Sequence, residues 1–105
     1  MPYPQRTPTT QAVGAALKRE GFGRSQSSGC FYQVAGYAVR KCRTQPDAVE
    51  VRWQPDSREA ASPDIYNDTE TRRTRMLLRY ADRLLAQGFR SQKRDDRLIV
   101  YGRIR

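Results

Sequence analysis

The most regular pattern of hydrophobic and polar positions along the chain is an alternation in which Val49, Val51 and Trp53 are separated by polar residues. Alternation with a period of two is typical of a strand with one buried face. Residues 30–41 are rich in aromatic and β-branched side chains, which predicts a second strand with a bulge at its glycine. A turn is predicted between the two strands, where a proline adjoins an aspartate.

Hydrophobic residues recur at helical spacing in two other segments. In the first segment Thr9 or Thr10 is a suitable N-cap, and the helix is predicted to reach about Glu20. In the second segment Asn67 and Glu70 form a capping-box pattern ahead of a longer helix. The apolar positions of this second helix are Leu77, Leu78, Ala81, Leu84 and Leu85, with Tyr80 beside them.

Both predicted helices end at a Gly-Phe pair. Gly21 and Gly88 suit the left-handed position that ends a helix, because glycine has no Cβ to clash there. The similarity extends further, since residues 17–39 and 84–105 align with one inserted glycine. Each segment contains a helix end, an Arg-Ser-Gln sequence and a strand with a late glycine, which predicts an internal structural repeat.

These elements predict an α+β fold in a small single domain. The expected order is α-β-β-α-β, with a short extra strand allowed after each helix, in a mostly antiparallel sheet that has both helices on one face. A hairpin turn over residues 93–97 leads into the last strand. Residues 1–8 contain three prolines and predict a flexible N-terminal arm, so the domain is expected to span residues 9–105.

Charge adds a candidate partner to this fold. The 105 residues carry a net charge of +9, and seventeen of the twenty basic residues are arginine. A guanidinium stays charged and binds phosphate or carboxylate with a planar fork. The net charge is +5 in residues 1–47, −3 in residues 48–68 and +7 in residues 69–105. We therefore expect a polyanionic partner that is bound mainly by the C-terminal third.

The composition gives little support to catalysis or to a cofactor. The chain has no histidine and only two cysteines, Cys30 and Cys42, so neither a metal nor another cofactor is expected. Both thiols lie near the ends of one predicted strand and are expected to stay reduced. No carboxylate pair has an orienting partner, so an enzyme is not expected. No apolar run predicts a signal peptide or a membrane span, so we expect a cytoplasmic protein without a membrane partner.

The candidate binding surface is a row of arginines on one side of the second predicted helix. At about 100° per residue this row lies nearly opposite the stripe of Leu77, Ala81 and Leu84. The row is either a binding face or an ordinary solvated face. Solvated faces usually mix glutamate with lysine, and only Asp82 interrupts this one, which favours an anion that offsets the repulsion. The members of the row are Arg72, Arg75, Arg79 and Arg83.

Further basic residues lie outside this helix. The turn at residues 93–97 is either a projection that contacts phosphate or a charged tip that its mixed signs keep soluble. The two Arg-Ser-Gln segments are either paired polar contacts or the polar beginnings of edge strands. The full set of candidate nucleic-acid-binding residues is Arg72, Arg75, Arg79, Arg83, Arg90, Lys93, Arg94 and Arg24.

Two functions fit this set of residues. The first is binding of nucleic acid, DNA or RNA, through the phosphate backbone with modest sequence preference. The alternative is a protein-interaction or regulatory module whose basic face docks on an acidic protein partner. Both functions use arginine-rich surfaces, so composition leaves both open.

Overall fold

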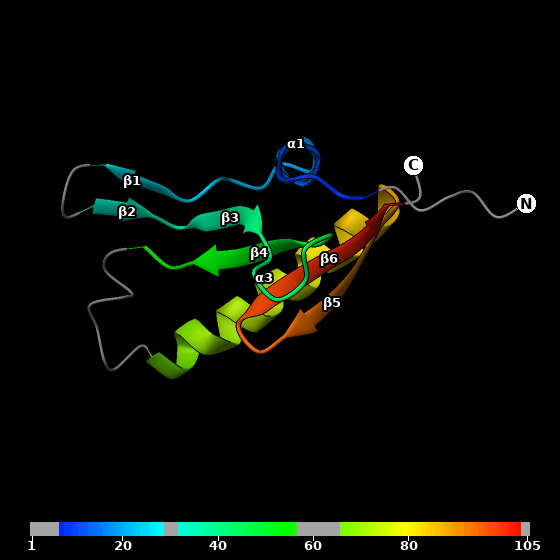
Figure 1. Ribbon diagram of the computed structural model, residues 1–105. Helices are drawn as coiled ribbons and strands as arrows, with labels where there is room; N and C mark the ends of the chain where they lie inside the picture. The colour runs from blue at the N-terminus through cyan, green and yellow to red at the C-terminus, as the bar shows by residue number, and fades with distance from the viewer. Residues whose placement is uncertain (1–6, 29–31, 57–65, 104–105) are drawn as a thin grey trace, which may run out of the picture.

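The structure, a computed structural model, describes residues 7–28, 32–56 and 66–103 (Figure 1). Its elements are α1 (Thr10–Arg19), β1 (Gln26–Ser28), β2 (Tyr32–Val34), β3 (Gly36–Lys41), β4 (Val49–Gln54), α3 (Tyr66–Ala86), β5 (Phe89–Arg94) and β6 (Arg97–Arg103). The predicted α+β fold is confirmed, and the extra strand allowed after each helix is present as β1 and as β5. Residues 1–6 of the predicted arm and Cys30 lie outside the described residues.

The main sheet has the strand order β3-β4-β6-β5, and all of its neighbouring strands are antiparallel. Its register places Tyr37 opposite Trp53 and Val51 opposite Leu98, so inward-facing apolar residues of neighbouring strands lie side by side. The β1-β2 hairpin is a separate sheet that extends beyond the main one (Figure 1). The long predicted strand is therefore divided, because β2 pairs with β1 and β3 pairs with β4.

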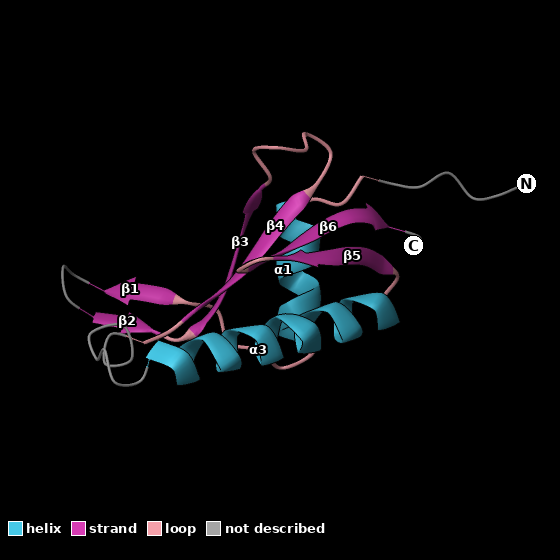
Figure 2. Cartoon of the chain, turned by 90° about the horizontal axis from the view of Figure 1, so that it is seen from below, coloured by secondary structure: helices cyan, strands magenta, loops and turns pink. Residues whose placement is uncertain are grey.

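Both helices cover the same face of the main sheet, as predicted, and α1 crosses α3 at a steep angle (Figure 2). The inward side of α3 contributes Leu77, Tyr80 and Leu84, each at most 1% exposed. The ring of Phe22 lies edge-on to that of Tyr80, with 4.8 Å between the ring centroids, and so joins the segment after α1 to α3. The other buried residues of this core are Val13, Ala16, Leu17, Tyr37, Val49, Val51, Trp53, Phe89, Leu98 and Val100.

The beginning of α1 and the ends of both helices follow the predictions. The Thr9 hydroxyl accepts a hydrogen bond of 3.1 Å from the backbone N–H three residues later, which makes it the N-cap of α1. Gly21 has a φ of 88° and Gly88 a φ of 91°, so both occupy the left-handed region. After α1 the Phe22 N–H donates to the Leu17 carbonyl at 3.2 Å. This is the hydrogen bond of a Schellman motif that closes over six residues.

A hairpin follows each Gly-Phe pair, but the two hairpins have different surroundings. The β1-β2 hairpin forms a sheet of its own, whereas β5 and β6 make up half of the main sheet. Phe89 is buried, whereas Phe22 is half-buried. The two segments share a helix end, a left-handed glycine and a hairpin. The internal structural repeat of residues 17–39 and 84–105 stays a prediction.

Two local features fall at other residues than predicted. Helix α3 begins at Tyr66, so Asn67 lies inside its first turn and not at the N-cap. The interruption of the long predicted strand falls at Ala35, and Gly36 is the first residue of β3. A Cβ atom at Gly36 would collide with the backbone of residues 23–25. Glycine at this position therefore permits two backbones to cross closely and does not mark a bulge.

Replacing Leu84 with alanine is expected to lower the free energy of unfolding by about 2–5 kcal/mol, because this side chain is fully buried between α3 and the sheet. Leu85 is the matched control, since it follows directly in the same helix and is 61% exposed. Leu85→Ala should change the free energy of unfolding by less than about 0.5 kcal/mol. Chemical denaturation measures both, and equal losses would contradict the observed orientation of α3.

Replacing Gly36 with alanine is expected to cost more stability than the same change at Gly21. At Gly21 the added methyl group meets no atom within 4 Å, so only the left-handed backbone opposes it, at about 1 kcal/mol. At Gly36 the methyl group collides with backbone that hydrogen bonds of 2.8 and 3.0 Å hold to Tyr37. Thermal denaturation compares the two variants, and a smaller loss for Gly36→Ala would show that the crossing is looser than described.

Candidate functional site

Two arginines of the α3 row lie over aromatic rings. The Cζ atom of Arg72 lies 5.4 Å from the centroid of the Trp53 ring, and that of Arg79 lies 5.7 Å from the centroid of the Phe22 ring. A guanidinium over an aromatic face is attracted by the negative potential of the ring. The two rings therefore restrict the positions of these two guanidiniums.

The row lies nearly opposite the buried leucines of the predicted stripe, and the buried side of α3 also includes Tyr80. Tyr80 lies at the margin of the buried side that is nearer the row, whereas Leu78 and Leu85 are exposed. Because Tyr80 is closer than the predicted stripe to the row around the helix, the buried side is rotated toward the arginines. Arg75 and Arg83 are exposed, and neither forms an ion pair with any residue in the described ranges.

Strand β5 carries three further predicted site residues. Arg90 and Arg94 are exposed on this edge strand, whereas Lys93 is half-buried and its Nζ donates to the backbone carbonyl of Asp95 at 2.8 Å. The hairpin turn is Asp95-Asp96, as predicted, with Asp95 in the left-handed region at a φ of 50°. The contact of Lys93 within the turn favours the interpretation of a charged tip over that of a phosphate-binding projection.

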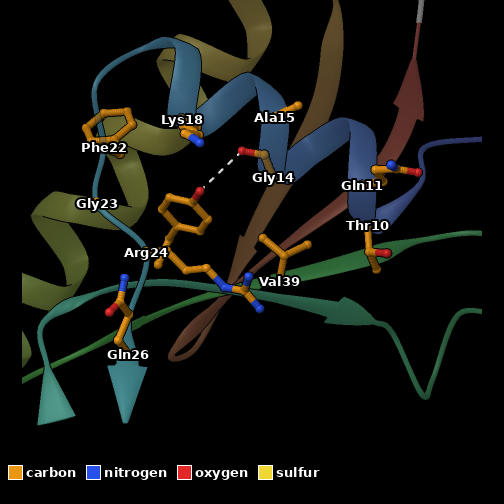
Figure 3. Close-up of a pocket in the computed structure, with 11 residues that line it drawn as sticks. Thr10, Gln11, Gly14, Ala15, Lys18, Phe22, Gly23, Arg24, Gln26 and Val39 are labelled. Carbon is orange, nitrogen blue, oxygen red and sulfur yellow. Dashed lines mark hydrogen bonds between the residues drawn. The ribbon is translucent and has the colours of Figure 1, made fainter. Parts of the chain in front are cut away.

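Arg24 lies at a pocket beside α1 that is also lined by Phe22, the ring that Arg79 overlies (Figure 3). The pocket has a volume of about 690 Å³, and Lys18 supplies a second cation at its wall. The Tyr37 hydroxyl donates to the Gly14 carbonyl at 3.3 Å and so holds β3 against α1 at this pocket. No carboxylate occurs among the described residues that line it. Arg24 and Arg90, the arginines of the two Arg-Ser-Gln segments, thus have different surroundings.

A third basic group, which the sequence pattern did not predict, lies on the face of the main sheet away from the helices. At its centre is the side chain of Glu50, which is 2% exposed. Arg97 Nη1 donates to Glu50 Oε1 at 2.8 Å, and Arg52 Nε donates to Glu50 Oε2 at 3.0 Å. Arg40 Nε also donates to Oε2. We name these four residues, Glu50, Arg40, Arg52 and Arg97, the Glu50 cluster.

The register of the sheet assembles this cluster. Glu50 lies directly opposite Arg40 of β3, and Arg52 lies opposite Arg97 of β6. Side chains two residues apart on a strand point to the same face, so Glu50 and Arg52 point outward together. The alternation in residues 49–54 was sufficient to predict this direction. The burial of Glu50 depends on strands that are distant in the sequence, so the alternation carried no signal of it.

The arginines keep Glu50 ionised. Burial by itself would raise the pKa of Glu50, but hydrogen bonds from Arg40, Arg97 and Arg52 outweigh burial and lower this pKa to about 2. The hydrogen bond to Glu50 in turn raises the pKa of Arg97. At neutral pH the cluster therefore consists of one carboxylate and three guanidiniums.

Comparisons with protein-family models, with curated proteins and with solved structures find no match. Within the described ranges, no group of three or more histidine, cysteine, aspartate or glutamate side chains is placed to hold a metal ion. Among the described helices, none is both long and apolar enough to cross a membrane. The described residues do present three groups of cations, which are the α3 row, the pocket at Arg24 and the Glu50 cluster.

Acidification is expected to destabilise the fold through Glu50. The pKa of this carboxyl is about 2 in the folded protein against an ordinary value of 4.5, so the unfolded chain takes up the proton first. The stabilisation is fully present above the ordinary pKa and is lost as the pH falls toward 2. It amounts to at most about 3.5 kcal/mol, because one pKa unit corresponds to about 1.4 kcal/mol.

The Glu50→Gln variant is the control for this prediction. It should be less stable than the wild type at neutral pH and should lack this part of the acid dependence. Urea denaturation at about pH 6 and about pH 3 measures both proteins. Equal losses of stability in the two proteins would show that other carboxylates cause the acid dependence.

Proposed function

We propose that the protein binds nucleic acid through the phosphate backbone, with the arginine row of α3 as its principal contact. The observation that carries the proposal is the exposure of Arg75 and Arg83 without a carboxylate partner among the described residues. Like charges along one side of a helix repel each other. A phosphate backbone offsets this repulsion, and the guanidinium fork is suited to phosphate oxygens.

The length of the row suits several phosphate groups. From Arg72 to Arg83 the helix rises about 16 Å, and duplex DNA presents about nine phosphate charges over that distance. The rings beneath Arg72 and Arg79 restrict these long side chains before binding, which reduces the entropy that binding removes. Contacts from arginine to phosphate carry no sequence information, so DNA or RNA is expected to bind with modest sequence preference.

Replacing Arg75 and Arg83 together with glutamine is expected to weaken binding roughly tenfold to a hundredfold at low salt, because two charge-assisted contacts are lost. The slope of log affinity against log salt should also fall by about 2, since each phosphate contact contributes about 0.9 on duplex DNA. Fluorescence anisotropy on an arbitrary duplex and an arbitrary single strand, each at two salt concentrations, measures both effects.

Asp82→Asn is a control of opposite sign. Asp82 is an exposed acid on the same helix, so its neutralisation should strengthen binding. Neither change should lower the melting temperature by more than a few degrees, because exposed charges contribute about 0–1 kcal/mol to stability. The proposal is wrong if the wild type binds neither duplex nor single strand at low salt.

One observation favours a second candidate function, an interaction or regulatory module that docks on an acidic protein. Leu78 and Leu85 are 54% and 61% exposed, and being seven residues apart they share one side of α3. Exposed apolar side chains beside charged ones are typical of protein interfaces. A single stoichiometric partner that survives nuclease treatment, and that the Leu78→Ser/Leu85→Ser variant no longer binds, would favour this function.

A further inference from the structure

The Glu50 cluster lies on the opposite face of the main sheet from α3. The helix packs on the inward positions of the sheet, such as Leu98 and Val100, whereas Glu50, Arg52 and Arg97 occupy outward positions. Figure 2 shows α3 along one side of the sheet only. The α3 row and the Glu50 cluster therefore present positive charge on different sides of the molecule.

The guanidiniums of the cluster are positioned in advance of any ligand. Each donates at least one hydrogen bond to Glu50, a side chain that the sheet holds in place. The side chains of Arg40, Arg52 and Arg97 nevertheless remain 51%, 32% and 29% exposed. A guanidinium has more N–H donors than these bonds use, so the cluster retains donors for an anion at the surface.

Glu50 does not balance the charge around it. One carboxylate faces three guanidiniums, and Asp96 approaches Arg52 only to 4.0 Å with a side chain that is 54% exposed. Arg94 of β5 lies opposite Arg97 and adds a further cation on the neighbouring strand. One carboxylate neutralises only one of the three positive charges, and the surplus indicates an external anion.

The surroundings of the cluster favour phosphate groups over an acidic protein. Protein interfaces have an apolar centre, and the exposed pair Leu78 and Leu85 lies on α3 instead. Of the large hydrophobic residues that are exposed in the described chain, only Tyr101 belongs to the main sheet. Tyr101 lies four residues after Arg97 on the same face of β6, and an exposed aromatic ring on a sheet suits the stacking of a base, as in proteins that bind single strands.

We propose that the Glu50 cluster is a second binding site for the phosphodiester groups of nucleic acid. Arg40, Arg52 and Arg97 donate to the phosphate oxygens, and Glu50 is the positioning residue that holds them. One molecule then contacts two segments of nucleic acid, one on α3 and one on the sheet, and links them. This inference rests on the proposed function and adds a second site on the opposite face.

Binding of inorganic phosphate to the full chain tests the site directly. Nitrogen-15 NMR follows the arginine Nε–H signals while phosphate replaces chloride at constant ionic strength. We expect saturable shifts for Arg40, Arg52 and Arg97. Arg43 is the reference, because it is exposed in the loop after β3 and forms no hydrogen bond with Glu50 in the described structure. Equal shifts for all four signals would overturn the proposal and leave the cluster as an internal ion-pair network.

Capture of a second duplex tests the linking of two segments. An immobilised duplex is loaded with protein and then offered a fluorescent duplex, which the wild type should retain. Arg40→Gln leaves two arginines on Glu50 and should lower this retention roughly tenfold, because a charge-assisted phosphate contact is lost. Its affinity for the first duplex should change by less than about twofold, which also verifies that the variant is folded. Arg43→Gln is the matched control and should behave as the wild type.

The outcomes separate this inference from the proposed function. Retention by Arg40→Gln equal to that of the wild type overturns the second site, even where the substitutions at Arg75 and Arg83 weaken binding as expected. Absence of binding to any nucleic acid overturns the proposed function first. Anionic lipid vesicles and polyglutamate are competitors with a similar charge. If either displaces the second duplex more strongly than free nucleic acid does, the assignment of the site to nucleic acid is wrong.

Discussion

The burial of Glu50 constrains three strands of the sheet at once. Glu50 is the one charged side chain that is buried in the described part of the chain. A carboxylate can be removed from water only where hydrogen bonds and opposite charges replace its hydration, and here three guanidiniums do so. They reach one carboxylate only in the observed register of β3, β4 and β6. A slip of β6 by one residue would turn Arg97 toward the core and Leu98 toward solvent.

Tyr80 imposes a comparable constraint on the inner face. Its ring lies edge-on to the rings of Phe22 and Tyr37, with centroid distances of 4.8 and 6.4 Å. Burial raises the pKa of the Tyr80 hydroxyl, which therefore stays protonated over the whole physiological range. Because Tyr80 widens the buried side of α3 toward the arginine row, two members of the row lie at the border of the core. Arg72 and Arg79 can then lie over Trp53 and Phe22, rings that also belong to the core or pack against it.

The α3 row and the Glu50 cluster are thus held by different physical means. On α3 the supports are aromatic rings, which orient a guanidinium without neutralising it. On the sheet the support is a carboxylate, which orients three guanidiniums while neutralising one charge. Both means restrict long side chains and keep a net positive charge at the surface, which is what binding to a polyanion requires. For each of these two groups, the affinity for a polyanion is expected to depend on salt.

Patterns among neighbouring residues were sufficient to predict most elements of the fold. The alternation of Val49, Val51 and Trp53 and the periodicity of α3 follow from the geometry of single elements, so each was readable from neighbouring residues. The glycines that end the helices were readable for the same reason, since the left-handed backbone at Gly21 and Gly88 is a property of one residue. Arginine content likewise indicated positive surfaces without reference to any fold.

Tertiary structure decided which cations lie together. The rotation of α3 depends on the fit of Tyr80 among rings from other segments, and a helical pattern that includes five apolar positions and a tyrosine does not specify it. The Glu50 cluster depends on the pairing of β4 with both β3 and β6, which joins Glu50 to Arg40, ten residues before it, and to Arg97, 47 residues after it. Patterns among neighbouring residues specified the elements, the faces of the strands and the sign of the surface charge. Which side chains share a site was settled only by strand order, register and helix rotation, because these arise from packing between segments that are distant in the chain.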